Sequence, residues 1–349
     1  MKQYYEEITF IRAIACLLVV LTHVTLMYPI EEMNLGLKLS LVINQFARVG
    51  TPIFCIISAF LLFNGFKDKT LNYRKFLISR IKKIVIPYFI WSVFYLVIMD
   101  VTGKSNFDSS KILKYIFLGD SYVHLYFIAI VLQFYLFYVL SHQIFNKNNI
   151  AQWTLLLIIL MIIWYLVRDS IYAINHRALL INWIGFFMMG GYLAYHFEQI
   201  KQWIMYLKDY LIYYVIIGLL VSLLEMDIPK LFTSDRMMNL ILVPLAIAFI
   251  IVLYWKSNHI IIYLLSYVGN RAMGIYLVHM LVIGVLGEVI PKSFWNPYML
   301  LFNYILVIAV TLITVDVLSL LPKSNYLFPI AKSPGQKEML WRKIIHRVH

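Results

Sequence analysis

The stretch ITFIRAIACLLVVLTHVTLMYP, residues 8–29, decides the fold. A helix needs roughly 20 mostly apolar residues to cross the hydrocarbon core of a bilayer, and this stretch supplies them. It does not read as a cleavable signal peptide, because its apolar run is too long and because Glu6 and Glu7 precede it. We therefore expect the first transmembrane helix here.

Nine further apolar stretches follow, so we expect an all-α integral membrane protein with a bundle of about ten transmembrane helices. They lie at about residues 42–64, 84–102, 124–144, 151–168, 180–198, 209–225, 237–255, 272–290 and 298–320. No connection between them is long enough for a soluble domain, so residues 1–349 are expected to form a single membrane-embedded domain. The shorter segment 257–270, bounded by Gly269 and Asn270, is expected to be an interfacial helix that leads into the ninth span.

The composition agrees with a membrane protein and excludes several other classes. Of the 349 residues, 62% are hydrophobic and 13% are charged, and the mean hydropathy is +0.80. A soluble domain is about half apolar and about a quarter charged, so a soluble enzyme and a disordered chain are both excluded. Cys16 and Cys55 are too few for a disulfide framework, and no residue cluster has metal-ligand spacing, so no metal is expected.

The formal net charge of +13 is explained by the membrane and does not require nucleic acid. Lysine and arginine are concentrated in the connection after the second span and in the segment 321–349, which we expect to be a basic cytoplasmic tail. By the positive-inside rule these segments are cytoplasmic, and an even number of spans puts both termini there. A multi-pass protein of a bacterial plasma membrane is expected.

Arg12 and His23 are the first candidates for a functional site, because ionisable side chains within a membrane are costly. After eleven residues an α-helix returns to within roughly 20° of the starting direction and has risen by roughly 16 Å. The side chains of Arg12 and His23 are therefore expected to face one lumen. An arginine suits phosphate or carboxylate, and a histidine suits proton transfer. The alternative is that Arg12 reaches to the interface and His23 bonds a neighbouring helix.

Two further groups are candidates. Tyr276 and His279 share a helix face at a spacing of three residues, which suits either a site or a hydrogen bond between helices. The stretch containing Arg80, Lys82 and Lys83 can bind the phosphates of a cytosolic donor, or it can only fix topology and contact anionic lipid.

A helix break is expected within the second span. Gly50-Thr51-Pro52 interrupts it, and Ser58 follows. Inside a membrane such a break must line protein or a cavity, although a simple proline kink is the alternative.

Several motifs together resemble the membrane acyltransferase-3 family over nearly the whole chain. The family's features are an arginine or lysine followed after ten residues by histidine, a G-x-P-x-F segment, an R-x-x-R pair before P-Y, an H-L-W-F segment, a double glycine and an I-Y-L-x-H motif. They match Arg12 with His23, Gly50-Thr51-Pro52-Ile53-Phe54, Arg80 with Lys83 before Pro87-Tyr88, His124-Leu125-Tyr126-Phe127, Gly190-Gly191 and Ile275-Tyr276-Leu277-Val278-His279. Lys83 departs from the family's second arginine and loses its bidentate fork.

The resemblance implies an O-acyltransferase that moves an acyl group, acetyl or succinyl, from cytosolic acyl-coenzyme A to a hydroxyl of a cell-surface polysaccharide. It implies His23 and Arg12 as catalytic residues, with His23 as general base or transient acyl carrier. Donor binding is implied for Arg80, Lys82, Lys83, Tyr276 and His279, and a substrate pocket is expected from Ser58, Arg48, His124 and Gln133. Implied partners are membrane lipid, an extracellular glycan and, as a further candidate, a polysaccharide synthase complex.

Within the family, the closest likeness is to the membrane proteins of biofilm intercellular-adhesion loci, whose polymer is poly-N-acetylglucosamine. The segment typical of peptidoglycan-acetylating members is absent, which argues against that acceptor. The likeness leaves a second hypothesis open, a polysaccharide exporter or flippase. Proton-coupled transporters commonly carry carboxylates in their spans, and Asp316 is the only acid deep in one here. A structural subunit of a synthase is the third possibility.

Overall fold

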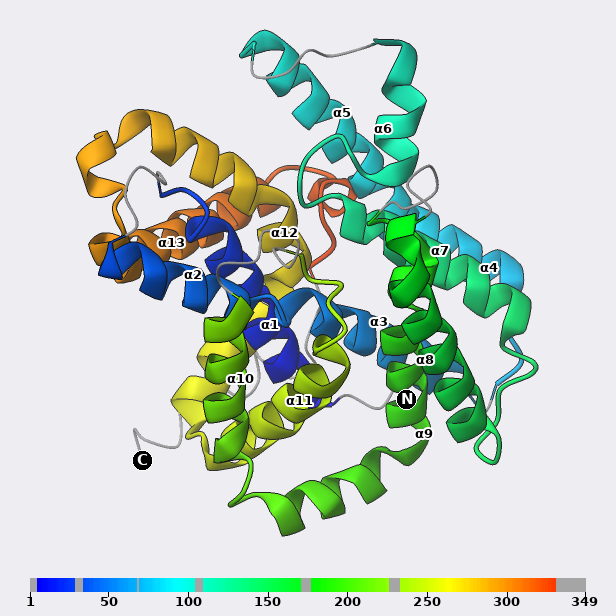
Figure 1. Ribbon diagram of the computed structural model, residues 1–349. Coiled ribbons are helices and arrows are strands. Elements are labelled where there is room, and N and C mark those ends of the chain that lie inside the picture. Colours follow the sequence, from blue (N-terminus) through cyan, green and yellow to red (C-terminus); the bar gives the residue numbers. More distant parts are fainter. Residues whose placement is uncertain are drawn as a thin grey trace, which may run out of the picture.

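The computed structural model describes residues 5–28, 34–67, 69–103, 109–170, 177–225 and 233–330, and within these ranges it contains helices and connections but no strand (Figure 1). The helices are α1 (Glu6–Val24), α2 (Leu35–Ala47), α3 (Gly50–Phe66), α4 (Tyr73–Arg80), α5 (Ile86–Val101), α6 (Ile112–Leu118), α7 (Tyr126–Ser141), α8 (Ile150–Val167), α9 (Ile184–Leu207), α10 (Ile212–Glu225), α11 (Asn239–Lys256), α12 (His259–Val289) and α13 (Leu300–Ser319). A π-helical turn, Ile81–Val85, joins α4 to α5.

The all-helical, membrane-spanning architecture is confirmed. In the described part of the chain, seven helices or joined helices are long and apolar enough to cross a membrane. An eighth span results if α9 and α10, bent by 89° at their junction, are counted as one, and α7 is a shorter apolar helix. Each of the ten predicted stretches is helical, but the count of ten and the cytoplasmic placement of both ends stay predictions. Most of the predicted tail, residues 331–349, lies outside the described residues.

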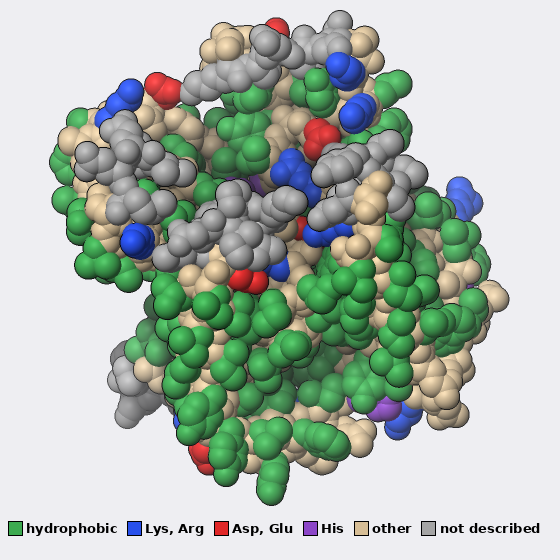
Figure 2. Space-filling model, viewed as in Figure 1, with side chains coloured by type: hydrophobic (Ala, Val, Ile, Leu, Met, Phe, Trp, Pro, Cys, Tyr) green, Lys and Arg blue, Asp and Glu red, His purple; other side chains and the backbone are tan. Residues whose placement is uncertain are grey.

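The surface has the character expected of a lipid-facing protein. Hydrophobic side chains cover most of the face seen in Figure 2. Large apolar side chains on different helices are exposed, among them Leu166 on α8, Leu224 on α10 and Leu301 on α13. Such a surface is unfavourable in water and suitable for lipid, so it supports a multi-pass membrane protein.

The segment 257–270 is helical and leads into the ninth span, but the boundary expected at Gly269 and Asn270 is absent, because α12 runs without a break from His259 to Val289. Gly269 does not end a helix but allows close helix packing. A Cβ built on it would lie 2.2 Å from the backbone oxygen of Thr9 on α1, so the absence of a side chain lets α1 and α12 pack closely. Gly190 does the same between α9 and α3, where its Cβ would lie 2.2 Å from the oxygen of Ile56.

The break expected in the second span is present two residues earlier than Gly50-Thr51-Pro52. The chain leaves α2 at Ala47 and enters α3 at Gly50. Pro52 then lies in the first turn of α3, where its missing N–H costs no helical hydrogen bond. The break is buried in protein, as a break at membrane depth must be.

Helix α1 lies at the centre of the bundle and positions both ends of the candidate site (Figure 1). It packs against α12, α3, α2, α11 and α13. Helix α9 is kinked at His196, near the end of the predicted sixth span, and then continues to Leu207. The polar groups described next therefore lie on helices that are held by packing on several sides.

Candidate functional site

A large cavity lies between α1, α3, α7, α12 and the π-helical turn. Its volume is about 1110 Å³, above the range of roughly 300–1,000 Å³ that is typical of small-molecule sites. Of the predicted residues, six line it: Arg12, Ser58, Arg80, Lys82, Lys83 and Tyr276. These residues come from four separate parts of the chain, so the fold brings together groups that sequence could only propose one by one.

One end of the cavity is strongly basic. The π-helical turn, which places Lys82 and Lys83 on the cavity wall, directly follows Arg80. π-helical turns occur frequently at functional sites. The Arg80 guanidinium contacts two aromatic rings, 5.0 Å from the Phe76 centroid and 4.7 Å from that of Tyr135, and these contacts hold it in position.

Sequence reasoning missed several lining residues. Lys67 and Lys69 belong to the same basic connection and add to the positive end. Lys67 already donates to the backbone oxygen of Ala194 at 2.8 Å. Asn325 and Tyr326 also line the cavity, so the chain after α13 returns to form part of the wall. The concentration of basic residues in this connection could have indicated Lys67 and Lys69 as lining residues, whereas no local sequence pattern marks Asn325.

Beside the other end of the cavity, three histidines gather behind Tyr276. The ring centroids of His23 and His279 are 5.2 Å apart, and those of His279 and His124 are 5.1 Å apart. Tyr276 connects this cluster to the cavity, since its ring is 5.2 Å from that of His124 and its hydroxyl donates to the His124 backbone oxygen. We call His23, His124 and His279 the histidine cluster.

The histidines do not line the cavity, which differs from the predicted arrangement. Arg12 faces the cavity, but His23, eleven residues further along α1, is not part of its lining, so the two do not share one lumen. His279 and His124 are buried, at 0% and 1% exposed, while His23 keeps some accessible surface. Tyr276 lines the cavity, and the His279 ring lies 6.0 Å from the ring of Tyr276 and 5.2 Å from that of His23.

Two predicted pocket residues have structural contacts and do not line the cavity. Gln133 donates to the backbone oxygen of Ala178 at 2.6 Å and accepts from the Leu180 N–H at 3.0 Å, so it fixes the chain before α9. Arg48 is buried and donates to Asn44 at 2.8 Å across one turn of α2. Arg48, His124 and Gln133 do not line this cavity, and their place in a substrate pocket stays a prediction.

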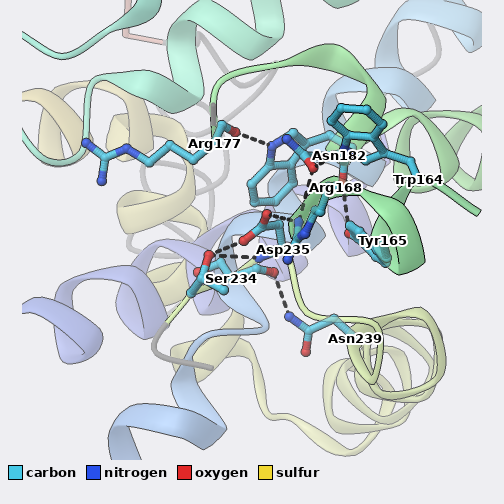
Figure 3. Close-up of polar contacts among 10 residues, drawn as sticks. Trp164, Tyr165, Arg168, Arg177, Asn182, Ser234, Asp235 and Asn239 are labelled. Atoms are coloured by element: carbon cyan, nitrogen blue, oxygen red, sulfur yellow. Dashed lines mark hydrogen bonds and ion pairs between the residues drawn. The ribbon is translucent and has the colours of Figure 1, made fainter. Parts of the chain in front are cut away.

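A separate polar network joins the chain ends of α8, α9 and α11 (Figure 3). The Arg168 guanidinium bonds Asp235 at 2.6 Å and Asn182 at 3.1 Å. Asn182 also accepts from Trp164 at 2.8 Å, and its backbone oxygen accepts from Tyr165 at 2.9 Å. Within this network the Arg168 and Asp235 side chains are paired with each other. Because the polar groups of this network bond to one another, the network has a structural role; buried charges are stable only when they are paired.

A second internal ion pair joins α12 to α13. Asp316 accepts from Arg271 at 2.6 Å and also from the Tyr267 hydroxyl. The Arg271 guanidinium lies 3.5 Å from the Tyr267 ring centroid. The one acid predicted deep in a span is thus neutralised by an arginine. Among the described residues, no group of histidine, cysteine or acidic side chains is arranged to hold a metal ion.

Comparisons with known proteins identify a family for this chain. A family model described as an acyltransferase domain matches residues 5–320. Proteins named probable poly-β-1,6-N-acetyl-D-glucosamine export protein are similar, at 27% identity in Staphylococcus aureus and 25% in Staphylococcus epidermidis. The matches cover 62% and 63% of this chain, and the chain spans 64% and 63% of the length of those relatives. No solved structure matches the chain.

Proposed function

The chain belongs to the acyltransferase-3 family, and from this premise we propose that it is an integral-membrane O-acyltransferase. The donor is an acyl-coenzyme A, carrying acetyl or succinyl, and the acceptor is a hydroxyl of a cell-surface polysaccharide. The observation that carries the proposal is the cavity of about 1110 Å³, which is lined by Arg80, Lys82 and Lys83 and also by Tyr276 beside the histidine cluster.

The basic end of the cavity fits the phosphates of coenzyme A. Arg80, Lys82 and Lys83 supply three cationic side chains there, and cationic donors bind phosphate oxygens strongly. Between this end and Tyr276, Asn270 lines the cavity, and within the described part of the chain its buried amide nitrogen has no hydrogen-bond partner. An unpaired buried donor suits an amide oxygen of the pantetheine arm. Arg12 then orients the thioester.

His23 is the group we assign to the acceptor. It is the one member of the histidine cluster that keeps accessible surface, so an acceptor hydroxyl can reach it. A histidine there acts as general base on the hydroxyl, or it carries the acyl group transiently. Tyr276 lines the cavity, and because its hydroxyl donates to the His124 backbone oxygen, its ring can position the thioester beside the histidine cluster.

The test of this function is the acyl content of surface glycans. Cells that carry the wild-type gene are compared with cells that carry His23→Ala, and glycans are analysed by mass spectrometry. We expect the variant to be inserted at the wild-type level but to leave the glycan unacylated. Full acylation by His23→Ala would exclude the assigned role.

The relatives named as export proteins favour a second candidate, export of a poly-N-acetylglucosamine-type polymer. The pairing of Asp316 with Arg271 and Tyr267 argues against it, because a carboxylate held in an ion pair is poorly suited to carry protons for transport. The same His23→Ala cells separate the candidates. Polymer that reaches the surface without acyl groups indicates the enzyme, and polymer retained inside indicates the exporter.

A further inference from the structure

The segment after α13 returns to form part of the cavity wall, and its backbone is unusual where it turns. Lys323 has a φ of 62°, a left-handed conformation that is uncommon for residues other than glycine. It directly precedes the 3₁₀ turn Ser324–Tyr326, whose Ser324 hydroxyl donates to the backbone oxygen of Ser319 at the end of α13. Backbone outliers of this kind cluster at functional sites, so the returning segment is a candidate for a function of its own.

Two contacts after the turn hold this segment in place. The indole N–H of Trp91 on α5 donates to the backbone oxygen of Leu327 at 3.0 Å. Phe328 is buried, and a Cβ on Gly274 of α12 would lie 3.3 Å from its ring. Because the segment is fixed against both α5 and α12, it gives the cavity a wall of defined geometry.

Asn325 and Tyr326 are the polar residues of this segment that line the cavity. Both are exposed, and Tyr326 keeps 40% of its surface accessible. An accessible tyrosine ring offers a face for stacking. The amide of asparagine offers a donor and an acceptor side by side. Together the two side chains suit a flat heterocycle with donors and acceptors on its edge.

The 3₁₀ turn lies beside the basic end of the cavity. Cα atoms of Ser324–Tyr326 and of the π-helical turn Ile81–Val85 come within 8 Å of one another. Lys82 and Lys83 of the π-helical turn line the same cavity. In a nucleotide a single ribose separates the base from its phosphates. A nucleotide whose phosphates contact the two lysines can therefore place its base on the neighbouring 3₁₀ turn.

We propose that Tyr326 and Asn325 form the subsite for the adenine base of the donor coenzyme A. This inference rests on the proposed function and extends it to a part of the donor that does not react. Tyr326 stacks on the face of the base. The amide of Asn325 accepts from the exocyclic amine and donates to N7, the pairing by which an amide side chain recognises adenine. The subsite thus holds the end of the donor that is farthest from the thioester.

Two fragments of the donor separate this subsite from the rest of the cavity. Adenosine 3′,5′-bisphosphate contains the adenine, the ribose and the 3′-phosphate of coenzyme A, and 4′-phosphopantetheine lacks the nucleoside. Calorimetry on the purified full chain measures Kd for each fragment and for coenzyme A. We expect Tyr326→Leu to weaken binding of coenzyme A and of the bisphosphate by about tenfold, or about 1.4 kcal/mol, which lies in the range for base–aromatic stacking.

Binding of 4′-phosphopantetheine to Tyr326→Leu should stay within about twofold of wild type, and an equal loss for this fragment would overturn the subsite. Tyr326→Phe keeps the ring and should bind all three ligands like wild type. The matched control is Tyr298→Leu. Tyr298 belongs to the 3₁₀ turn before α13, Pro297–Met299, is 75% exposed and does not line the cavity. It should leave all three dissociation constants unchanged.

The role of Asn325 is tested with guanosine 3′,5′-bisphosphate, whose base carries a carbonyl oxygen where adenine carries its amine. Wild type should prefer the adenosine bisphosphate by about tenfold, and Asn325→Ala should reduce this preference to about twofold or less. A preference of the same size in wild type and Asn325→Ala would overturn the contact between Asn325 and the base.

Photolabelling of the wild-type protein covers the case in which Tyr326→Leu does not fold. 2-Azidoadenosine 3′,5′-bisphosphate should label the peptide that contains Ser324–Phe328, and unlabelled coenzyme A should prevent this. Labelling that occurs only elsewhere would overturn the subsite. Failure of the proposed function has a different result, since wild type would then bind neither coenzyme A nor the bisphosphate. Failure of the subsite alone leaves wild type able to bind coenzyme A, with Tyr326→Leu binding it equally tightly.

Discussion

Replacing Lys82 and Lys83 together by glutamine tests whether the basic end of the cavity binds a phosphorylated donor. Both side chains line the cavity and both are solvent-exposed. Two unit charges 4 Å apart interact by about 1 kcal/mol in water and about 4 kcal/mol at the effective dielectric constant near a protein surface. Exposure favours the lower part of this range, so we take about 1.5 kcal/mol for each lysine. Glutamine keeps length and polarity, so mainly the charge is removed.

Together the two substitutions should therefore weaken coenzyme A binding by about 3 kcal/mol, or about 150-fold in Kd. Calorimetry on the purified protein measures Kd at low and at high salt. The wild-type affinity should fall more steeply with salt than that of the double variant, because salt screens exposed charges. Dephospho-coenzyme A should bind the two proteins with a smaller difference if the lysines contact the 3′-phosphate.

The matched control is Lys75→Gln, an exposed lysine of α4 that does not line the cavity. It should leave Kd within about twofold of wild type. A double variant at Lys82 and Lys83 that binds coenzyme A as tightly as the control, with the same salt dependence, would refute the assignment of phosphates to this end of the cavity.

Three further predictions follow from packing and charge. Arg80→Lys keeps the charge but loses the planar guanidinium that contacts two rings, so Kd for coenzyme A should rise by about tenfold in calorimetry, and an unchanged Kd would show that charge alone matters. Gly190→Ala should lower the melting temperature in detergent by several degrees because its Cβ meets the backbone of α3, while Gly65→Ala, with open space around it, should not. Asp235→Asn should cost about 3 kcal/mol of stability by leaving Arg168 unpaired, and adding Arg168→Gln should restore part of it in thermal unfolding; no restoration would mean that the two do not interact.

The helices were predictable from the sequence because the signal is local. An apolar run such as residues 8–29 needs no partner to be recognised, and the structure forms α1 over Glu6–Val24. The error at 257–270 has a physical cause. Gly269 can end a helix or let two helices touch, and only the position of α1 decides between these.

The site was predictable in part for the same reason. The basic spacing around Arg80 and the rarity of Arg12 in an apolar run are visible in the chain itself. The sequence alone does not distinguish a polar side chain that lines a cavity, such as Ser58, from one that hydrogen-bonds to a nearby backbone group, such as Gln133. That difference depends on which helices become neighbours, as does the pairing of Arg271 with Asp316 across 45 positions of the chain.

The π-helical turn makes the length of its segment as important as its composition. One residue more is wound into such a turn than into an α-helical one, and deleting any residue of Ile81–Val85 would rotate α4 against α5 by about 100°. Neither helix is free to follow, since Arg80 contacts the rings of Phe76 and Tyr135 and Trp91 donates to the Leu327 backbone oxygen at 3.0 Å. A codon lost here would turn the lysines out of the cavity even though every remaining side chain is unchanged, whereas conservative replacements within the segment would be tolerated.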